Sequence, residues 1–143
     1  RIGSITHSHG IAEVLVADAD RWLAVGLDTE QWVVPERAAR LEKELFTDYE
    51  RQQLNRMTPL QRANRLTLIF SAKESLFKAL YPLTGKRFYF HDAERRKPDR
   101  LTLLRTLNAD WPKGTEIPCT VIVSLNSSMK SPRRLLVRIT AVE

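Results

Sequence analysis

The segment from Pro59 to Leu80 constrains the fold of this chain more than any other, because its apolar residues repeat with the period of an α-helix. The residues that carry the repeat are spaced three, four and seven apart: Leu66, Ile69, Phe70, Phe77 and Leu80. This spacing predicts a long helix with a buried apolar face. Pro82 and Gly85 follow the repeat and are expected to close the helix.

Strand-like segments precede and follow this helix. Before it, three short segments rich in Val, Ile, Leu and Trp are separated by turn residues, which predicts an antiparallel meander. These segments are Ile2–Ser8, Ala12–Ala17 and Trp22–Asp28. After the helix come four further strand-like segments: Arg87–His91, Leu101–Leu107, Ile117–Leu125 and Leu135–Val142. The order of strands, helices and strands predicts an α+β fold, in which an antiparallel sheet packs on the long helix.

Two shorter helices are expected between the first strands and the long helix. Pro35 opens a charged segment that contains Ala and Leu, Glu36–Leu45, and proline is favoured at the first position of a helix. Thr47 or Asp48 is expected to cap a second helix that runs through Met57. With 143 residues, of which 43% are hydrophobic, the chain suits one compact domain with its own core.

The composition restricts the classes of function. The chain has 23 Lys and Arg against 17 Asp and Glu, which gives a net charge of +6. This charge favours anionic partners, and by itself it leaves open nucleic acid, phosphorylated small molecules and an acidic protein. The single cysteine, Cys119, excludes an intramolecular disulfide and a Cys-based zinc finger, and it is compatible with a cytoplasmic protein. No apolar run approaches the roughly 20 residues of a membrane-spanning helix.

A pair of acidic residues follows the third predicted strand. If the strand continues to Glu30, the side chains of Asp28 and Glu30 lie on one face, because alternate residues of a strand share a face. Gly26 would let another backbone or a ligand approach beside them. Two such carboxylates repel each other unless a cation lies between them, and Mg²⁺ prefers oxygen ligands of this kind. The alternative is two solvated acids at the end of a strand.

The long helix carries a third acid and a lysine on an otherwise apolar segment. On a helix, Phe70, Glu74 and Lys78 are four residues apart and share one side. Glu74 and Lys78 could simply form an ion pair between neighbouring turns, worth about a few tenths of a kcal/mol. In a chain that already shows paired acids, they also provide what a metal–pyrophosphate site needs, namely acids for Mg²⁺ and a lysine for the phosphate charge.

The histidines offer one further site residue. His7 follows the small residues of Gly3–Thr6 and could donate a hydrogen bond to a phosphate oxygen. A structural role is the alternative for His7, and it is the role that we expect for His9 and His91. No helical or hairpin spacing joins the three histidines, so a zinc site is not expected.

Three of these segments together resemble the signature sequences of the Sfp-type 4′-phosphopantetheinyl transferases. They match in order and in spacing, and they are Gly3-Ser4-Ile5-Thr6-His7-Ser8, Val25-Gly26-Leu27-Asp28-Thr29-Glu30 and Phe70-Ser71-Ala72-Lys73-Glu74-Ser75-Leu76-Phe77-Lys78. The closest likeness is to the siderophore branch, the enterobactin synthetase component D type. The resemblance implies that residues 1–143 form the magnesium-binding, C-terminal half of a pseudo-dimer built from two similar halves.

The resemblance also implies roles for individual residues. Three acids match the magnesium-binding residues of the family: Asp28, Glu30 and Glu74. The residues that match positions near the coenzyme A phosphates are His7, Lys78 and Lys73; Lys78 would also assist the leaving group, and Lys73 has the less settled role. Glu50, at the end of the segment Phe46–Glu50, matches a candidate general base for the carrier serine. A metal-bound water is an equally reasonable base.

The activity that the resemblance implies is transfer of 4′-phosphopantetheine from coenzyme A to a serine of an acyl or peptidyl carrier protein. Mg²⁺ or Mn²⁺ would be the cofactor, and 3′,5′-ADP would leave. Members of this type bind coenzyme A between their two halves, and the first half has no counterpart after Arg1. We therefore expect a fragment, or a half that associates with another chain, and a nucleotide pocket that is incomplete in this chain alone.

Two other classes of function remain open. A non-catalytic carrier-protein-binding module would keep a docking surface, with apolar residues between Leu60 and Leu80 contacting a carrier helix. A nucleic-acid-binding domain is suggested by two basic clusters, Arg95–Lys97 and Arg133–Arg134, but no recognition motif or aromatic platform accompanies them. We expect these clusters to be solvated loops, or a surface that attracts an acidic carrier protein.

Overall fold

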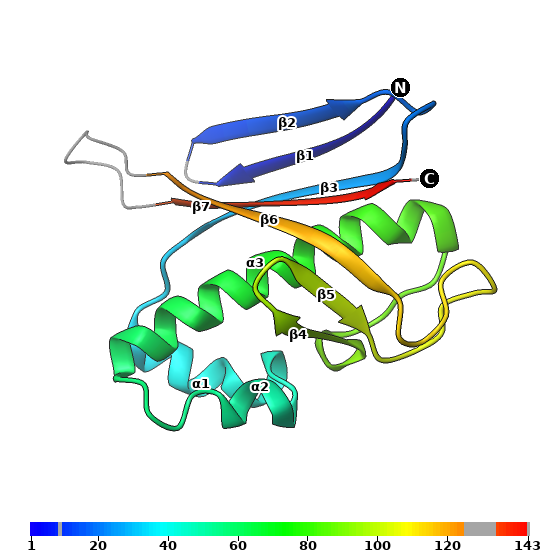
Figure 1. Cartoon of the computed structure of the whole chain (residues 1–143). Helices are drawn as coiled ribbons and strands as arrows, with labels where there is room; N and C mark the ends of the chain where they lie inside the picture. Colours follow the sequence, from blue (N-terminus) through cyan, green and yellow to red (C-terminus); the bar gives the residue numbers. More distant parts are fainter. Residues whose placement is uncertain (9, 125–133, 143) are drawn as a thin grey trace.

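The computed structural model describes residues 1–8, 10–124 and 134–142, and it confirms an α+β fold with an antiparallel sheet on a long helix (Figure 1). The strands are β1 (Ile2–Ser8), β2 (Ile11–Ala17), β3 (Trp22–Gln31), β4 (Ala93–Lys97), β5 (Arg100–Leu103), β6 (Glu116–Ser124) and β7 (Arg134–Val142). The helices are α1 (Pro35–Leu45), α2 (Asp48–Gln52) and α3 (Pro59–Thr84), with a short 3₁₀ helix, η1 (Phe90–Asp92).

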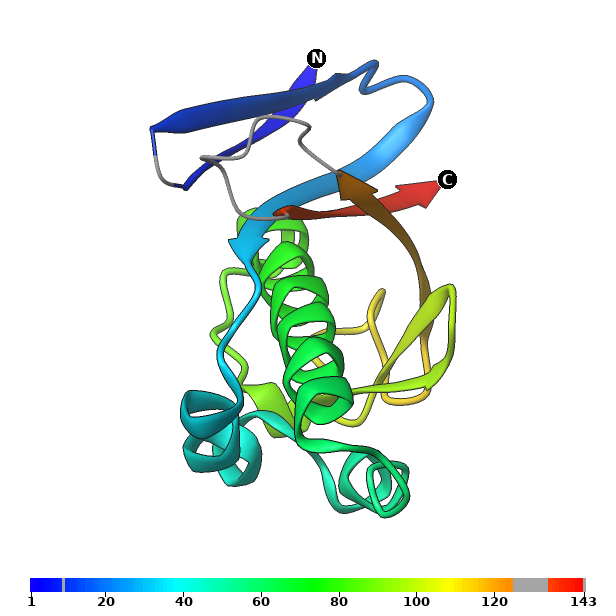
Figure 2. The ribbon, with the colours of Figure 1, turned by 90° about the vertical axis from the view of Figure 1, so that its left-hand side faces the viewer.

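The strands of the described residues form two separate sheets. Five of them make an antiparallel sheet in the order β3-β7-β6-β5-β4, and β1 and β2 form an antiparallel hairpin in which Ile5 lies opposite Val14. Figure 2 shows the hairpin at one end of the molecule, α1 and α2 at the other, and α3 running between these ends alongside the sheet. The long helix packs against β3 and β7 of the sheet and against α1, while the hairpin contacts β3.

The first three strands do not form the expected meander. β3 pairs with β7, and the hairpin meets β3 through side chains instead of through a backbone ladder. The backbone N–H groups of Leu27 and Thr29 donate to the hydroxyl oxygens of Ser4 and Thr6, at 3.0 and 3.1 Å. Because both hydroxyls are buried, they satisfy N–H groups that would otherwise need a neighbouring strand.

Helix α2 is shorter than expected and α3 is longer. α2 stops at Gln52 and does not reach Met57, because the chain turns there: the backbone N–H groups of Leu54 and Met57 donate to the carbonyl oxygens of Arg51 and Leu54, at 3.0 and 2.9 Å. α3 continues through Pro82 and ends only at Gly85, which has the left-handed φ of 63° that glycine adopts easily. None of the helices in the described part of the chain is long and apolar enough to cross a membrane.

The segment after α3 packs against that helix through aromatic rings, and it does not form the expected strand Arg87–His91. Phe88 meets the ring of Phe77 edge to face, with the ring centroids 4.6 Å apart, and Phe90 packs on Phe77 at 5.3 Å. The chain enters the sheet only with β4. The basic residues Arg95–Lys97 consequently lie on a strand and not in the expected loop.

The last three strands agree with expectation except at their ends. β6 and β7 confirm the predicted strands, although Leu125 and the basic residue Arg133 lie outside the described residues. β5 stops at Leu103 instead of Leu107, because the backbone N–H of Leu107 donates to the carbonyl oxygen of Trp111 in a turn, at 2.9 Å.

The core lies on two sides of α3. Between α3 and the sheet, the buried residues include Leu76, Leu80, Leu101, Leu103 and Ile117. Between α3 and the two shorter helices, they include Leu45, Phe46, Leu54, Leu66 and Ile69. A helix that is apolar on most of its circumference is buried in this way, so α3 is the centre of the fold.

Strand β3 and helix α3 approach each other most closely at Gly26. A Cβ atom at this position would overlap the backbone carbonyl oxygen of Ser75, and it would lie 3.0 Å from the Cβ atom of Ala79. Backbone atoms of a packed helix cannot move aside as the end of a flexible side chain can. The expectation that Gly26 admits another backbone is therefore confirmed.

We predict that Gly26→Ala lowers the free energy of unfolding by more than about 3 kcal/mol, because the added methyl group forces the strand away from the helix. Urea unfolding followed by circular dichroism measures this loss. Gly85→Ala is the matched control: its Cβ meets nothing within 4 Å, and only the positive φ opposes it, at a cost of about 1 kcal/mol. Equal losses for the two variants would contradict the close contact.

Candidate active site

The carboxylate of Asp28 is held by two residues of α3. Ser71 Oγ donates a hydrogen bond to Asp28 Oδ2 at 2.8 Å. Lys78 Nζ lies 3.2 Å from Asp28 Oδ1 and donates to the carbonyl oxygen of Leu27 at 2.9 Å. Asp28 is buried, so these contacts fix a charged group at the junction of β3 and α3.

Glu30 and Glu74 join Asp28 in one group of mutually repelling acids. Burial raises the pKa of Glu30 to about 7, and the charge and hydrogen bond of Asp28 and the charge of Glu74 add to this rise, while Lys78 opposes it. Burial also raises the pKa of Glu74, again with the charge of Asp28 adding and Lys78 opposing. The structure thus brings the three acids predicted from the sequence within electrostatic reach of one another.

The donor set fits a hard divalent cation, although it is not closed around one point. Three carboxylates beside one lysine are the kind of oxygen ligands that Mg²⁺ takes, usually one or two of them together with phosphate and water. As placed, the described side chains form no group of three or more His, Cys, Asp or Glu ready to hold a metal ion. The carboxylate of Asp28 is instead turned to Ser71 and Lys78.

His7 lies on the outer face of the hairpin. Its neighbour Thr6 faces β3, and successive strand residues alternate between faces, so the exposed His7 side chain lies on the other side of β1. Because Thr6 bonds to the backbone of Thr29, His7 stands level with the acids along β3. The structure therefore brings His7 to the same end of the strand but directs its ring away from Asp28 and Glu30.

Two cavities border the acidic group. The first has a volume of about 540 Å³, and Lys78, Lys86 and Arg87 bring positive charge to its otherwise apolar and aromatic lining. The second has a volume of about 410 Å³, and its lining is apolar apart from a few groups that include Glu30. Cavities of this size accommodate small molecules or extended side chains of a partner. Lys78 lines the first cavity and Glu30 lines the second, so each of these residues connects the acidic group to one cavity.

Lys73 lies outside this group, in the interior of the protein. Its side chain has no exposed surface. Its Nζ atom donates to Glu50 Oε1 at 2.6 Å and to the carbonyl oxygens of Leu45 and Phe90 at 2.9 and 2.7 Å. Burial lowers the pKa of Lys73, while the charge of Glu50 opposes this shift. All three protons of the ammonium group therefore have acceptors within the protein.

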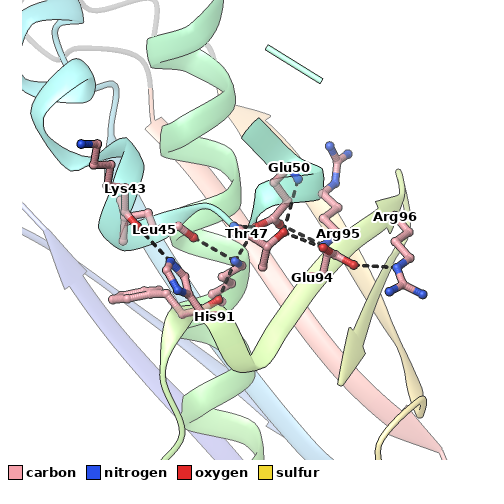
Figure 3. Close-up of polar contacts among 10 residues, drawn as sticks. Lys43, Leu45, Thr47, Glu50, His91, Glu94, Arg95 and Arg96 are labelled. Carbon is pink, nitrogen blue, oxygen red and sulfur yellow. Dashed lines mark hydrogen bonds and ion pairs between the residues drawn. The ribbon is translucent and has the colours of Figure 1, made fainter. Parts of the chain in front are cut away.

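Glu50 is equally enclosed (Figure 3). Besides Lys73, its carboxylate accepts hydrogen bonds from the backbone N–H groups of Thr47 and Arg95, at 2.9 and 3.0 Å. Neither Glu50 nor Lys73 can meet a phosphate or a carrier serine without breaking this network. The structure thus does not support Glu50 as the general base or Lys73 as a phosphate ligand, and it gives both residues a structural role.

Ser71 is a site residue that the sequence analysis missed. It donates to Asp28, and it lies on the same side of α3 as Glu74 and Lys78. Residues three and seven apart share a side of a helix, so the spacing 71, 74, 78 could have identified it. A lone serine carries too weak a signal for that spacing to be noticed without the partner strand.

Comparisons with known proteins identify the family of this chain. The sequence profile of the 4′-phosphopantetheinyl transferase superfamily matches residues 24–120. Over 97 residues the chain is 36% identical to 4′-phosphopantetheinyl transferase Svp from Streptomyces mobaraensis, an alignment that covers 65% of this chain and 37% of that protein. The chain therefore belongs to the 4′-phosphopantetheinyl transferase superfamily, and it spans little more than a third of the length of this relative.

A solved structure shows the same fold. The crystal structure of a holo-(acyl-carrier-protein) synthase from Bacillus anthracis, in complex with coenzyme A (3′,5′-ADP), aligns with a TM-score of 0.57. The alignment covers 86% of this chain and 98% of that chain, at 17% sequence identity. At this identity the likeness concerns the architecture, and it leaves the roles of individual residues to be argued from this chain.

The buried pair makes a prediction that separates a structural from a catalytic role. Lys73→Met leaves the Glu50 carboxylate buried without its cation, so we expect the free energy of unfolding to fall by about 3–5 kcal/mol. In the double variant Lys73→Met/Glu50→Gln the loss is smaller than the sum of the two single losses. Urea unfolding measures all three, and Lys43→Met, at an exposed lysine, is the control. Purely additive losses would argue against the pair.

The raised pKa of Glu30 predicts a pH dependence. Folded Glu30 holds its proton up to about pH 7, whereas the unfolded chain loses it near the ordinary value of 4.5. The stability that this proton contributes is therefore complete below 4.5 and is lost as the pH rises through 7. Urea unfolding at about pH 5 and about pH 8 should show a larger loss for the wild type than for Glu30→Gln. Glu36→Gln, at an exposed acid, should match the wild type.

Proposed function

We propose that this chain forms the metal- and phosphate-binding part of an enzyme that transfers 4′-phosphopantetheine from coenzyme A to a carrier protein. The observation that carries the proposal is the coupling of Asp28, Glu30 and Glu74 beside Lys78, in a chain of the phosphopantetheinyl transferase superfamily. Asp28 helps to raise the pKa of both Glu30 and Glu74, so a divalent cation would stabilise this group, and the adjacent lysine suits a phosphate.

In this proposal Asp28, Glu30 and Glu74 hold Mg²⁺ or Mn²⁺. Bound there, the ion would offset the negative charge that the pyrophosphate of coenzyme A develops during the reaction. The contacts of Asp28 support this assignment, because Lys78 and Ser71 already fix one carboxylate of the three in place. Glu30 and Glu74 are only half-buried, so their side chains can turn toward a shared ligand.

The lysine and the first cavity supply the substrate contacts. Lys78 lies between Asp28 and the cavity of about 540 Å³, so its ammonium group can donate to a phosphate oxygen placed at the mouth of that cavity. Lys86 and Arg87 add positive charge there, and the apolar lining suits an uncharged arm attached to the phosphate. His7 would contact the pyrophosphate from the hairpin, after a change of its side-chain direction.

The proposed reaction is an in-line displacement at the β-phosphorus of coenzyme A. A bond forms between the serine oxygen of the carrier and this phosphorus, while the bond from the phosphorus to the bridging pyrophosphate oxygen breaks. 3′,5′-ADP leaves with the electron pair of the broken bond, and the proton of the serine hydroxyl passes to water. The buried position of Glu50 argues against that residue as the acceptor of the proton.

The hairpin supports the further proposal that a second protein part completes the pocket. Ile5, Val14 and Val16 expose 65%, 61% and 57% of their surface on the face that also carries His7. An apolar face of this kind on a two-stranded sheet is unusual unless another surface covers it. The resemblance to the siderophore branch suggests that this surface is the other half of a pseudo-dimer. The siderophore pathway and the acyl or peptidyl carrier protein are proposed on the basis of the same resemblance.

The test begins with Mg²⁺ binding, which does not depend on any other part of a longer protein. We expect Glu74→Gln to weaken Mg²⁺ binding by at least about tenfold in calorimetry, because one of three anionic ligands is lost. Glu36→Gln, at an exposed acid of α1, should bind Mg²⁺ as the wild type does. Equal binding by Glu74→Gln would overturn the metal assignment.

The second arm of the test measures transfer. Mass spectrometry of an apo carrier protein, incubated with coenzyme A, Mg²⁺, the chain and the protein part that completes its pocket, should show the added phosphopantetheine group, and Glu74→Gln should reduce the rate by at least about a hundredfold. Carrier binding that persists in Glu74→Gln while transfer is lost supports catalysis. Carrier binding without transfer in the wild type, even with the remaining protein part added, would favour a non-catalytic module.

A further inference from the structure

A third cavity lies on a different side of α3 from the acidic group. Its volume is about 530 Å³, and α3 contributes Gln61, Arg65 and Leu68 to its lining. These residues are spaced four and three apart, so they share one stripe of the helix. Arg65 and Lys78 are 78 − 65 = 13 residues apart, which at about 100° per residue places them about 140° apart around the axis. The cavity therefore lies away from Lys78, and Trp32 separates it from the cavity of about 410 Å³ that Glu30 lines.

Two arginines bring unbalanced positive charge to this cavity. Arg65 comes from α3 and Arg95 from β4, and of the described residues that line the cavity none is acidic. Burial lowers the pKa of Arg95, and the nearby charge of Arg65 lowers it further, with smaller opposing effects from Cys119 and Glu50. The Glu50 carboxylate is already bound to Lys73 and contacts Arg95 through its backbone N–H. The repulsion between the two guanidinium groups thus remains.

The rest of the lining consists of four apolar or aromatic residues and two amides, Gln61 and Asn64, and Trp32 brings one orphan donor. Trp32, Met57 and Pro98 form walls of the cavity together with Leu68. Among the described residues, Trp32 Nε1 is the buried side-chain nitrogen or oxygen that has no hydrogen-bond partner. Buried polar atoms are nearly always satisfied, and an exception calls for an explanation such as a bound molecule or a local rearrangement on binding.

We propose that this cavity binds the phosphate or carboxylate group of a small molecule with an apolar body. Two guanidinium groups that repel each other are stabilised by one oxyanion between them, and each offers a planar fork of donors that matches such a group. Within residues 1–8, 10–124 and 134–142, the Arg95 side chain makes one hydrogen bond, from Nη2 to the carbonyl oxygen of Pro98 at 2.9 Å. A volume of about 530 Å³ lies within the usual range of about 300–1000 Å³ for small-molecule sites.

Phenyl phosphate and benzoate are suitable probes, because each carries one oxyanion on an apolar ring. Inorganic phosphate serves as the probe that lacks an apolar ring. The titrations use the chain with Lys78→Gln, which weakens phosphate binding at the proposed active site. The signal of the Trp32 indole N–H in ¹H–¹⁵N spectra reports binding at this cavity or at the cavity of about 410 Å³, which Trp32 also lines, and loss of the shift in the Arg65 and Arg95 variants assigns it to this one. We expect saturable shifts with phenyl phosphate or benzoate below about 10 mM, and weaker binding of inorganic phosphate. The tighter of the two ring probes identifies phosphate or carboxylate as the preferred group.

Variants then test the two arginines. We expect Arg65→Gln and Arg95→Gln each to weaken binding of the tighter probe by about tenfold or more, and Arg65→Lys to weaken it less, because the charge remains but the fork is lost. Arg40→Gln, at an exposed arginine of α1, should change nothing. The unchanged spectrum of Arg65→Lys shows that the fold survives substitution at this position. An unmoved Trp32 signal at about 10 mM probe, or wild-type affinity in both glutamine variants, overturns the proposal.

Discussion

The contact between β3 and α3 at Gly26 is the constraint on which the candidate site depends. Because no side chain separates the strand from the helix backbone at Ser75, both elements are held at a distance at which short polar side chains can meet. Asp28 is then within reach of Ser71 and of Lys78, which lie about two turns apart on one side of the helix. A wider spacing between β3 and α3 would break both contacts of Asp28, because the side chains of serine and aspartate are short.

A second constraint fixes the rotation of the helix about its axis. Lys73 extends into the interior and satisfies three acceptors that come from three other segments of the chain. Neighbouring residues on a helix point about 100° apart, so a fixed Lys73 also fixes the direction of Glu74. A buried ion pair is a poor source of stability compared with apolar packing, but its geometry is demanding. The pair of Lys73 and Glu50 therefore serves here to orient α3. A lysine of the family motif can have this role without touching the substrate.

The sequence predicted the parts of this structure that depend on local patterns. The period of α3, the acids at the end of β3 and the approach of a backbone at Gly26 all follow from residues close together in the chain. The sequence could not show that Ser4 and Thr6 replace a backbone ladder, because their hydroxyls matter only after the hairpin has docked. The sequence also could not show that Lys73 is buried.

The reason for that last failure is physical. On α3, Lys73 and Lys78 look alike, as charged residues on a mainly apolar helix. What separates them is the partner that each meets, and these partners lie far away in the sequence: Glu50 for Lys73, and Asp28 for Lys78. Side-chain periodicity identifies the faces of a helix but not which face is covered by polar groups from other elements. A resemblance has the same limit, because a shared motif does not say which of its residues point inward.

The distribution of unpaired charge distinguishes functional from structural sites in this fold. Where a charge is fully buried, as at Lys73, the protein neutralises it completely with hydrogen bonds and an opposite charge. Yet repulsion persists in two half-buried places, among the acids around Glu30 and between Arg65 and Arg95. A fold that can balance a buried lysine has the means to balance these groups as well. Charge left unbalanced beside a cavity is therefore better explained by a ligand of opposite sign than by an inability to pair it.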